Sequence, residues 1–165
     1  MRCAQTPLGL SHLNADDRRL VNLGNSLSKR SAEVAQLCEE LRIPLIEENP
    51  AGSFLWLVHG RLARAQKEHW RTVIVDQCSC GRPYRKRTRF DVLFADEVLL
   101  SQLPRCVNRL CTFTGKKHVV LGLGATSAAA EYPVPLASRI ARTLVTCAKR
   151  KEAEEIWCKF QNPCD

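Results

Sequence analysis

Apolar residues near the N-terminus recur at a spacing that predicts a long helix. They follow one another at near-helical intervals, at Leu20, Leu27, Val34, Leu37, Cys38 and Leu41. Asp16 and Asp17 precede this series, at a position where carboxylates stabilise a helix N-terminus. We therefore expect a first helix over residues 16–41.

Short apolar runs further along the chain predict strands. Residues 43–48 form an extended run that ends at Asn49-Pro50, because proline lacks a backbone donor and disfavours helix in the residue before it. Residues 72–75 are β-branched throughout, and residues 90–94 form another apolar run. We also expect a strand at residues 118–121.

Helical segments alternate with these strands. Ser53 can cap a short helix, residues 98–103 suggest one or two helical turns, and residues 133–160 predict a closing helix with prolines in its first turn. Strands that alternate with helices indicate an α/β fold. We expect a single domain over residues 1–165.

The charge balance indicates the kind of partner. The chain has 25 Lys+Arg against 17 Asp+Glu, a formal net charge of +8, which favours a polyanionic partner or a membrane surface over an acidic partner. No run of about 18 apolar residues occurs, and the first ten residues lack the apolar stretch of a secretory signal. We expect no membrane insertion and an intracellular location, nuclear or cytoplasmic.

Nine cysteines are an odd number, so they cannot all pair with one another, and without a secretion signal we interpret them as reduced thiols. Cys38, Cys147 and Cys158 lie in helix-like sequence and are expected to fill the core. A second group lies in turn-like sequence and offers soft ligands for zinc: Cys78, Cys80, Cys106, Cys111 and His118. Its spacing is C-x-C and then C-x4-C, without paired C-x2-C knuckles. A zinc site is therefore kept as the alternative, and no metal is the first expectation.

Two polar segments follow predicted strands, where ligands bind in open α/β sheets. The first contains Glu47 and Glu48, and a carboxylate there can bind the edge of a flipped pyrimidine. The second is basic and includes a tyrosine that can stack on a base; its candidate nucleic-acid-binding residues are Arg82, Tyr84, Arg85, Lys86, Arg87 and Arg89. The simpler interpretations are a solvated acidic turn and a basic hairpin or localisation signal.

Three segments in this order resemble the later motifs of cytosine-5 DNA methyltransferases. They are residues 44–50 (PLIEENP), 81–89 (GRPYRKRTR) and 132–137 (YPVPLA). In that family a strand ends in Glu-Asn-Val, a later loop reads Gly-x-Pro-Gln-x-Arg-x-Arg, and a final helix opens with a proline-containing motif. The resemblance covers about residues 41–144. The sequences Glu-Asn-Pro and Arg-Lys-Arg-Thr-Arg are more similar to those of divergent methyltransferase-like domains in some retroelement-encoded proteins than to those of the restriction-system enzymes.

The resemblance implies roles for two residues. Glu48 takes the place of the glutamate that holds and helps activate the target cytosine. Lys86 takes the place of an arginine that orients the base, and it supplies charge without the bidentate fork. Tyr84 replaces the family's glutamine, and Thr88 its second arginine. The implied fold is a partial Rossmann-like methyltransferase sheet with flanking helices, with DNA as partner and S-adenosylmethionine as cofactor.

The family's Pro-Cys nucleophile and its glycine-rich cofactor loop have no counterpart in this sequence. Cys3 is the only cysteine upstream of Glu48 apart from Cys38, and it lacks the preceding proline. Residues 119–127 contain G-x-G-x-x-S, for which a structural glycine turn is the favoured interpretation. We therefore expect a truncated, catalytically incomplete domain that does not bind S-adenosylmethionine alone.

Two alternatives from other classes stay open. One is a small zinc-stabilised nucleic-acid-binding module. The other is a basic protein-interaction scaffold, which can self-associate through an open sheet edge. The methyltransferase resemblance also predicts a geometry: Glu48 and Lys86 should lie at the same end of the sheet, on the order of 10 Å apart, if the strands before them are parallel.

Overall fold

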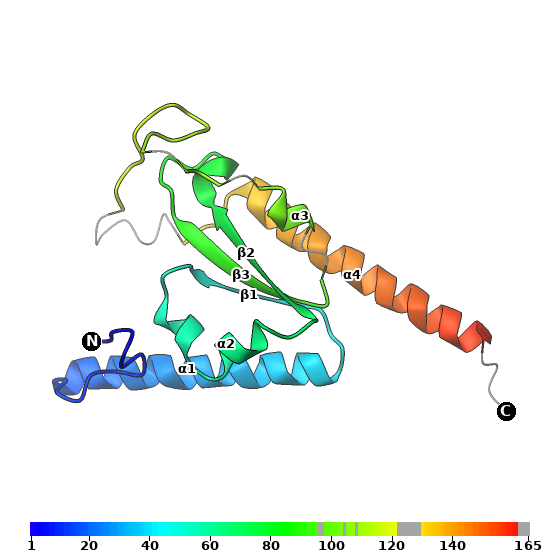
Figure 1. Cartoon of the computed structure of the whole chain (residues 1–165), viewed down its shortest axis with the longest axis horizontal. Coiled ribbons are helices and arrows are strands. Elements are labelled where there is room, and N and C mark those ends of the chain that lie inside the picture. Colours follow the sequence, from blue (N-terminus) through cyan, green and yellow to red (C-terminus); the bar gives the residue numbers. More distant parts are fainter. Residues whose placement is uncertain (96–97, 104, 108, 122–129, 162–165) are drawn as a thin grey trace.

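The structure is a computed structural model that describes residues 1–95, 98–103, 105–107, 109–121 and 130–161 (Figure 1). A three-stranded sheet lies between a long N-terminal helix and a long C-terminal helix. The expected fold class is confirmed at the level of a mixed α/β fold. The glycine-containing segment 122–127 lies outside the described residues.

The first helix, α1 (Ala15–Glu40), confirms the helix predicted from the N-terminal apolar spacing. It begins where Asn14 caps it, since the Asn14 side-chain oxygen accepts a hydrogen bond from the Asp17 N–H at 2.8 Å. The residues that α1 buries are small or medium-sized: Val21, Ser28 and Ala35. The large apolar residues that predicted the helix are mostly exposed.

The sheet consists of β1 (Leu45–Pro50), β2 (Trp70–Asp76) and β3 (Arg87–Leu93) in the order β1-β3-β2. Both pairings are antiparallel, and β3, the last strand in the chain, lies in the centre. Strands β1 and β2 therefore run parallel to each other without being hydrogen-bonded neighbours. The described residues do not show the parallel sheet of a Rossmann fold.

The remaining elements are short, with one exception. Ser53 caps η1 (Phe54–Leu57) as expected, by accepting from the Leu55 N–H at 3.2 Å. The other short elements are α2 (Arg61–Arg64), η2 (Gln77–Cys80) and α3 (Val98–Ser101). The closing helix α4 (Val134–Gln161) confirms the helix predicted from residue 133 onwards. None of the described helices is long and apolar enough to cross a membrane.

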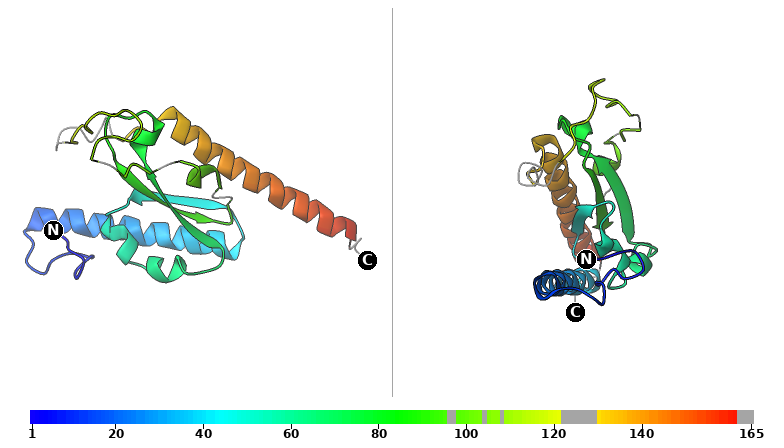
Figure 2. Two further views of the ribbon diagram at one scale, coloured as in Figure 1. Left: turned by 45° about the horizontal axis from the view of Figure 1, so that its top comes forward. Right: turned by 90° about the vertical axis from the view of Figure 1, so that its left-hand side faces the viewer.

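Side chains alternate between the two faces of the sheet, and each face has its own core. Val92 and Phe90 pack with residues of α3 and α4, including Leu100 and Leu136. Leu93 points to the other face, where the buried cluster contains Leu45, Trp70 and two residues of α1, Ala35 and Cys38. Figure 2 shows α1 and α4 as separate layers around the sheet.

Two sequence predictions were wrong in their extent. Residues 118–121 were expected to form a strand, but the structure has only an isolated bridge between Leu110 and Lys117 there. The basic loop was expected to run to residue 89, but β3 already begins at Arg87. At this end of β3, Arg87 pairs with Asp76 and Arg89 with Asp91.

Candidate metal centre

Three cysteines and one histidine converge beside the end of β2. Cys78 lies in η2, directly after β2, and Cys106, Cys111 and His118 come from the loop that follows α3. Their ligand atoms all lie within 4.8 Å of one another. The three cysteines are almost fully buried, at 1%, 0% and 4% exposed, and they form a cluster of their own.

The chemistry of this set fits a structural zinc ion. Zinc prefers four tetrahedral ligands, and Cys3His is one of its usual structural sets. Bond lengths of about 2.3 Å to sulfur and 2.0–2.1 Å to nitrogen place ligand atoms roughly 3.5–3.8 Å apart. The Cys106 Sγ and His118 Nε2 atoms are 3.4 Å apart. The set therefore needs shifts of about 1 Å or less to close around one ion.

A tight hairpin holds Cys111 in position. The Cys111 N–H donates to the Lys116 carbonyl at 2.8 Å, and the Gly115 N–H donates to the Cys111 carbonyl at 2.8 Å. Gly115 has a φ of +67°, a conformation that glycine adopts without strain. The Thr112 N–H points at the Cys106 sulfur at 3.3 Å, an outer-shell contact that favours a thiolate.

Asp76 anchors the loop that carries Cys106 to the sheet. Its carboxylate accepts the Cys106 backbone N–H at 3.0 Å and two hydrogen bonds from Arg87 at 2.9 and 3.0 Å. Burial acts to raise the Asp76 pKa, but these hydrogen bonds and the charges of Arg87 and Arg85 outweigh it and hold the pKa below its ordinary value. The charged carboxylate thus fixes the backbone of a ligand residue.

Different surroundings separate the pKa values of two of the thiols. Burial, together with hydrogen bonds that the Cys78 thiol donates to Cys106 and Cys111, raises the pKa of Cys78 to about 12. A hydrogen bond from Thr114, with further help from backbone groups and His118, lowers the pKa of Cys111 to about 6. Thiols gathered this closely resist simultaneous ionisation, and a bound cation removes that repulsion.

The sequence prediction contained all four members of this cluster and one residue that does not belong to it. Cys80 was included in the candidate set, but its side chain packs in the main core with Val75 and Leu100 and belongs to neither the cluster nor its surroundings. Residues 77–80 form one turn of 3-10 helix, which separates the side-chain directions of Cys78 and Cys80. The C-x-C spacing alone does not reveal which of the two is the ligand.

The exposed charged side chains of the loop around the cluster are all basic. Residues 105–121 contain no Asp or Glu, and the exposed cations of this loop are Arg105, Arg109, Lys116 and Lys117. Phe113 lies at the hairpin turn and is 38% exposed. Figure 1 shows the loop projecting beyond one end of the sheet. These residues were not among those predicted from the sequence, although the absence of acidic residues over this stretch indicates a basic surface.

The basic segment predicted to bind phosphates is largely neutralised within the chain. Arg89 forms two hydrogen bonds with Asp91 at 2.7 and 2.8 Å and stacks over the Trp56 ring at 4.4 Å. Arg87 and Arg85 pair with Asp76, and Arg82 donates to the Glu131 carbonyl at 3.1 Å.

Tyr84, the residue expected to stack on a base, is only 6% exposed. Burial leaves little of its ring accessible, so the structure argues against that role. Lys86 is half-buried directly before β3, at the end of the sheet where Glu48 also lies, since Glu48 pairs with Phe90. Phe90 is four residues from Lys86 along the chain, and the expected convergence of the Glu48 and Lys86 side chains stays a prediction.

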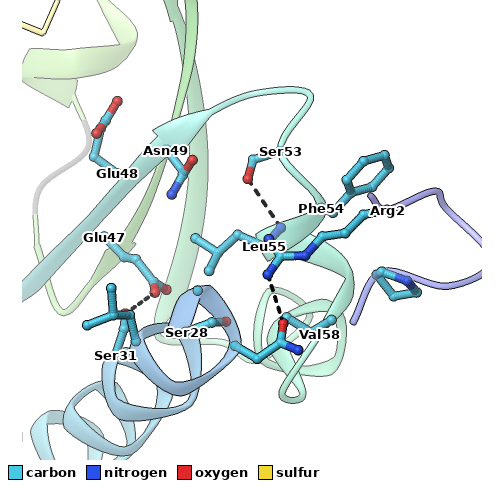
Figure 3. A pocket seen from close by; sticks show the side chains of 14 residues that line it. Arg2, Ser28, Ser31, Glu47, Glu48, Asn49, Ser53, Phe54, Leu55 and Val58 are labelled. Atoms are coloured by element: carbon cyan, nitrogen blue, oxygen red, sulfur yellow. Dashed lines mark hydrogen bonds between the residues drawn. The ribbon is translucent and has the colours of Figure 1, made fainter. Parts of the chain in front are cut away.

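Adjacent glutamates of β1 point to opposite faces of the sheet (Figure 3). Glu47 is buried and accepts hydrogen bonds from Ser31 at 2.6 Å and from Arg61 at 2.6 and 3.1 Å, and it also pairs with Arg64. Burial alone raises the pKa of Glu47, but the hydrogen bonds of Arg61 and Ser31 and both arginine charges lower it overall. Sequence reasoning singled out Glu48, whereas Glu47 carries this network.

Glu48 lies on the α4 face, where it is half-buried. Burial raises the pKa of Tyr132, and a hydrogen bond to Glu48 and the charge of Glu48 raise it further. The other oxygen of Glu48 is buried without a hydrogen-bond partner in the described residues. Glu48 thus retains an unused acceptor.

A polar cavity of about 410 Å³ lies between the N-terminal segment, α1 and β1 (Figure 3). Arg2, Glu47 and Asn49 are among its lining residues. Cys3 is not, and its thiol instead contacts the Thr6 hydroxyl at 3.0 Å. This hydrogen bond lowers the pKa of Cys3, but the thiol does not line the cavity beside Glu48.

Comparisons with known protein families, with curated proteins and with solved structures found no match.

Proposed function

We propose that this protein is a zinc-stabilised nucleic-acid-binding module. The observation that carries the proposal is the convergence of Cys78, Cys106, Cys111 and His118 at the base of a loop whose exposed charges are all positive. A zinc ion would close this loop and hold its shape. The loop's cations would contact phosphates, and Phe113 would stack on an unpaired base. An intracellular location, nuclear or cytoplasmic, is part of this proposal.

Two features make the loop of residues 105–121, which we call the metal loop, a better phosphate-binding surface than residues 82–89. The arginines at 85, 87 and 89 are already paired with Asp76 and Asp91. The cations of the metal loop are exposed, and no carboxylate within the described residues forms an ion pair with them. Free cations release counterions when they meet phosphates, whereas paired cations must first lose their partners.

Nucleic-acid binding should depend on the cations of the metal loop. Replacing Arg105, Arg109, Lys116 and Lys117 together with alanine should reduce affinity for single-stranded DNA or RNA roughly 100-fold and reduce the salt slope of log K by about 3. Fluorescence anisotropy across a salt series measures both quantities.

A matched control removes four exposed charges elsewhere, at Lys29, Arg42, Arg142 and Lys149. This control variant should keep most of the affinity, because its charges lie outside the loop. Equal losses in the two variants would mean that net charge alone drives binding, and an unchanged salt slope in the loop variant would remove the loop from the interface.

A second candidate function, a DNA cytosine-5 methyltransferase-like protein, is supported by how the resembling segments meet. Glu48 contacts Tyr132, Arg82 donates to the Glu131 carbonyl, and β1 pairs with β3. Three segments far apart in the sequence therefore lie together at one end of the sheet. A partial Rossmann-like sheet is the fold that goes with this candidate, and S-adenosylmethionine is not expected to bind this chain alone.

The second candidate predicts base binding without chemistry. A duplex with a cytosine opposite an abasic site should bind at least about fivefold more tightly than a paired duplex, because such a base is easily flipped. Glu48→Gln should abolish the preference, and the exposed control Glu68→Gln should retain it. Radiolabelled methyl transfer should stay at the buffer level, since no matched nucleophile is present. Equal binding of both duplexes would reject this candidate, whereas measurable methyl transfer by the chain alone would contradict its expected catalytic incompleteness.

A further inference from the structure

A stripe of large apolar side chains runs along α1 without anything packed on it in the part of the chain that the structure describes. Each of its six members is between 52% and 63% exposed: Leu20, Leu23, Leu27, Val34, Leu37 and Leu41, the last at the cap of the helix. We refer to these six residues as the α1 stripe. Monomeric proteins rarely leave such a continuous apolar surface open.

The spacing of the α1 stripe is that of a coiled-coil seam. Its members are separated alternately by three and four residues, and Arg30 takes the one remaining position of the series. A seven-residue repeat keeps apolar side chains in line with a partner helix over three heptads. The residues that α1 buries against its own chain, Val21, Ser28 and Ala35, lie on a different side.

We propose that the α1 stripe is the seam of an antiparallel coiled coil formed with α1 of a second copy of this chain. The charges beside the stripe indicate that its partner is a second α1 in antiparallel orientation. On its outer side the flanking residues run from Arg19 through Ser26 to Glu33 and Glu40, basic at the start of the helix and acidic at its end. An antiparallel partner brings Arg19 of each copy beside Glu40 of the other.

A parallel partner gains no such pairing. The residues on the inner side of the stripe, Gly24, Ser31 and Cys38, are uncharged and half-buried against the chain's own body. Parallel helices would place these residues opposite the charged flank, and the charges would find no partner.

The area of the stripe meets what a stable dimer needs. Six leucine- or valine-sized side chains that are more than half exposed offer on the order of 600 Å² per copy, or about 1,200 Å² for a pair, at the lower limit of specific interfaces. Arg30 already forms an ion pair with Glu33 at 3.0 Å, so the Glu33 carboxylate compensates the charge that Arg30 brings to the seam. A single polar residue in a seam fixes the register of the two helices.

The oligomeric state of the full chain tests the dimer directly. Analytical ultracentrifugation should show a concentration-dependent dimer of the wild-type protein. The double variant Leu23→Glu/Leu37→Glu should raise the dimer Kd at least about 100-fold, because it places unpaired charges in an apolar seam. Asn22→Glu, exposed on α1 but outside the stripe, is the control and should remain dimeric. Far-UV circular dichroism should be the same for all variants.

Charge reversal tests the orientation. Arg19→Glu and Glu40→Arg should each weaken the dimer several-fold, and the two together should restore it, since every antiparallel pair is then reversed at both ends. A dimer that tolerates both leucine substitutions would overturn the proposal, as would a failure of the double reversal to restore affinity. A wild-type chain that is monomeric at all concentrations would also overturn it and would leave the stripe to a different protein.

Discussion

Replacing Cys106 with serine should lower zinc affinity by more than about 100-fold and weaken nucleic-acid binding along with it. Loss of a mere outer-shell partner typically costs 10–100-fold in metal affinity, and Cys106 is a direct ligand in this account. Its sulfur lies 3.4 Å from His118 Nε2 and accepts the Thr112 N–H. Without the metal, the loop that carries the cations is no longer held in one shape, and its contacts with phosphates weaken.

Cys80→Ala is the matched control for the Cys106 variant. Cys80 is a buried cysteine two residues from the ligand Cys78, but it packs in the main core. The control should therefore bind zinc normally and lose only a modest amount of stability. A competition titration with a chromophoric chelator measures affinity. Equal zinc affinity in the wild type and the Cys106→Ser variant would contradict the ligand assignment.

Replacing Glu47 with alanine should destabilise the fold by about 3–5 kcal/mol, because it leaves two buried arginines without a counter-charge. Arg61 is fully buried and Arg64 is 7% exposed. Arg64 also stacks over the Trp70 ring at 4.1 Å, so it cannot move into solvent without disturbing the core. Glu68→Ala, at an exposed position before β2, should change stability by less than about 0.5 kcal/mol. Urea denaturation measures both free energies of unfolding.

The same network predicts a pH dependence. The folded-state pKa of Glu47 is lowered below its ordinary value of 4.5, so its contribution is fully present above that pH and is lost as the pH falls through the folded-state pKa. The wild type should therefore lose stability below about pH 4.5 more steeply than Glu47→Gln, which has no charge to lose there. Parallel stability curves for the two proteins would contradict the network.

The elements were predictable where the information was local. Asp16 and Asp17 marked the start of α1, and the Ser53 side chain marked the cap of η1. The burial of α1 was not predictable in the same way, because Leu20 and Leu37 gave a helical period without showing whether the chain itself or a partner covers them. The seven-residue repeat was the available signal, and the structure shows that the apolar side faces outward.

The candidate site was only partly predictable because its parts meet through tertiary contacts. Cys78 and Cys106 are separated by 27 residues in the sequence, and tertiary contacts such as the hydrogen bond between Asp76 and the Cys106 backbone bring the loop 105–121 to the end of β2. Glu47 and Glu48 are adjacent residues of the same type, so the sequence does not show which of them is buried. Arg61 and Arg64 of α2 form ion pairs with Glu47. An intervening turn separates them from β1, so their spacing in the sequence does not show which glutamate they pair with.

The metal content of the purified chain tests the central claim most directly. Inductively coupled plasma mass spectrometry on protein prepared without chelators should find about one zinc ion per chain in the wild type and in Cys80→Ala, and almost none in Cys106→Ser. A folded wild-type protein that contains no zinc, and that takes up none when zinc is supplied, would contradict the claim that the cysteines and histidine beside β2 form a metal centre.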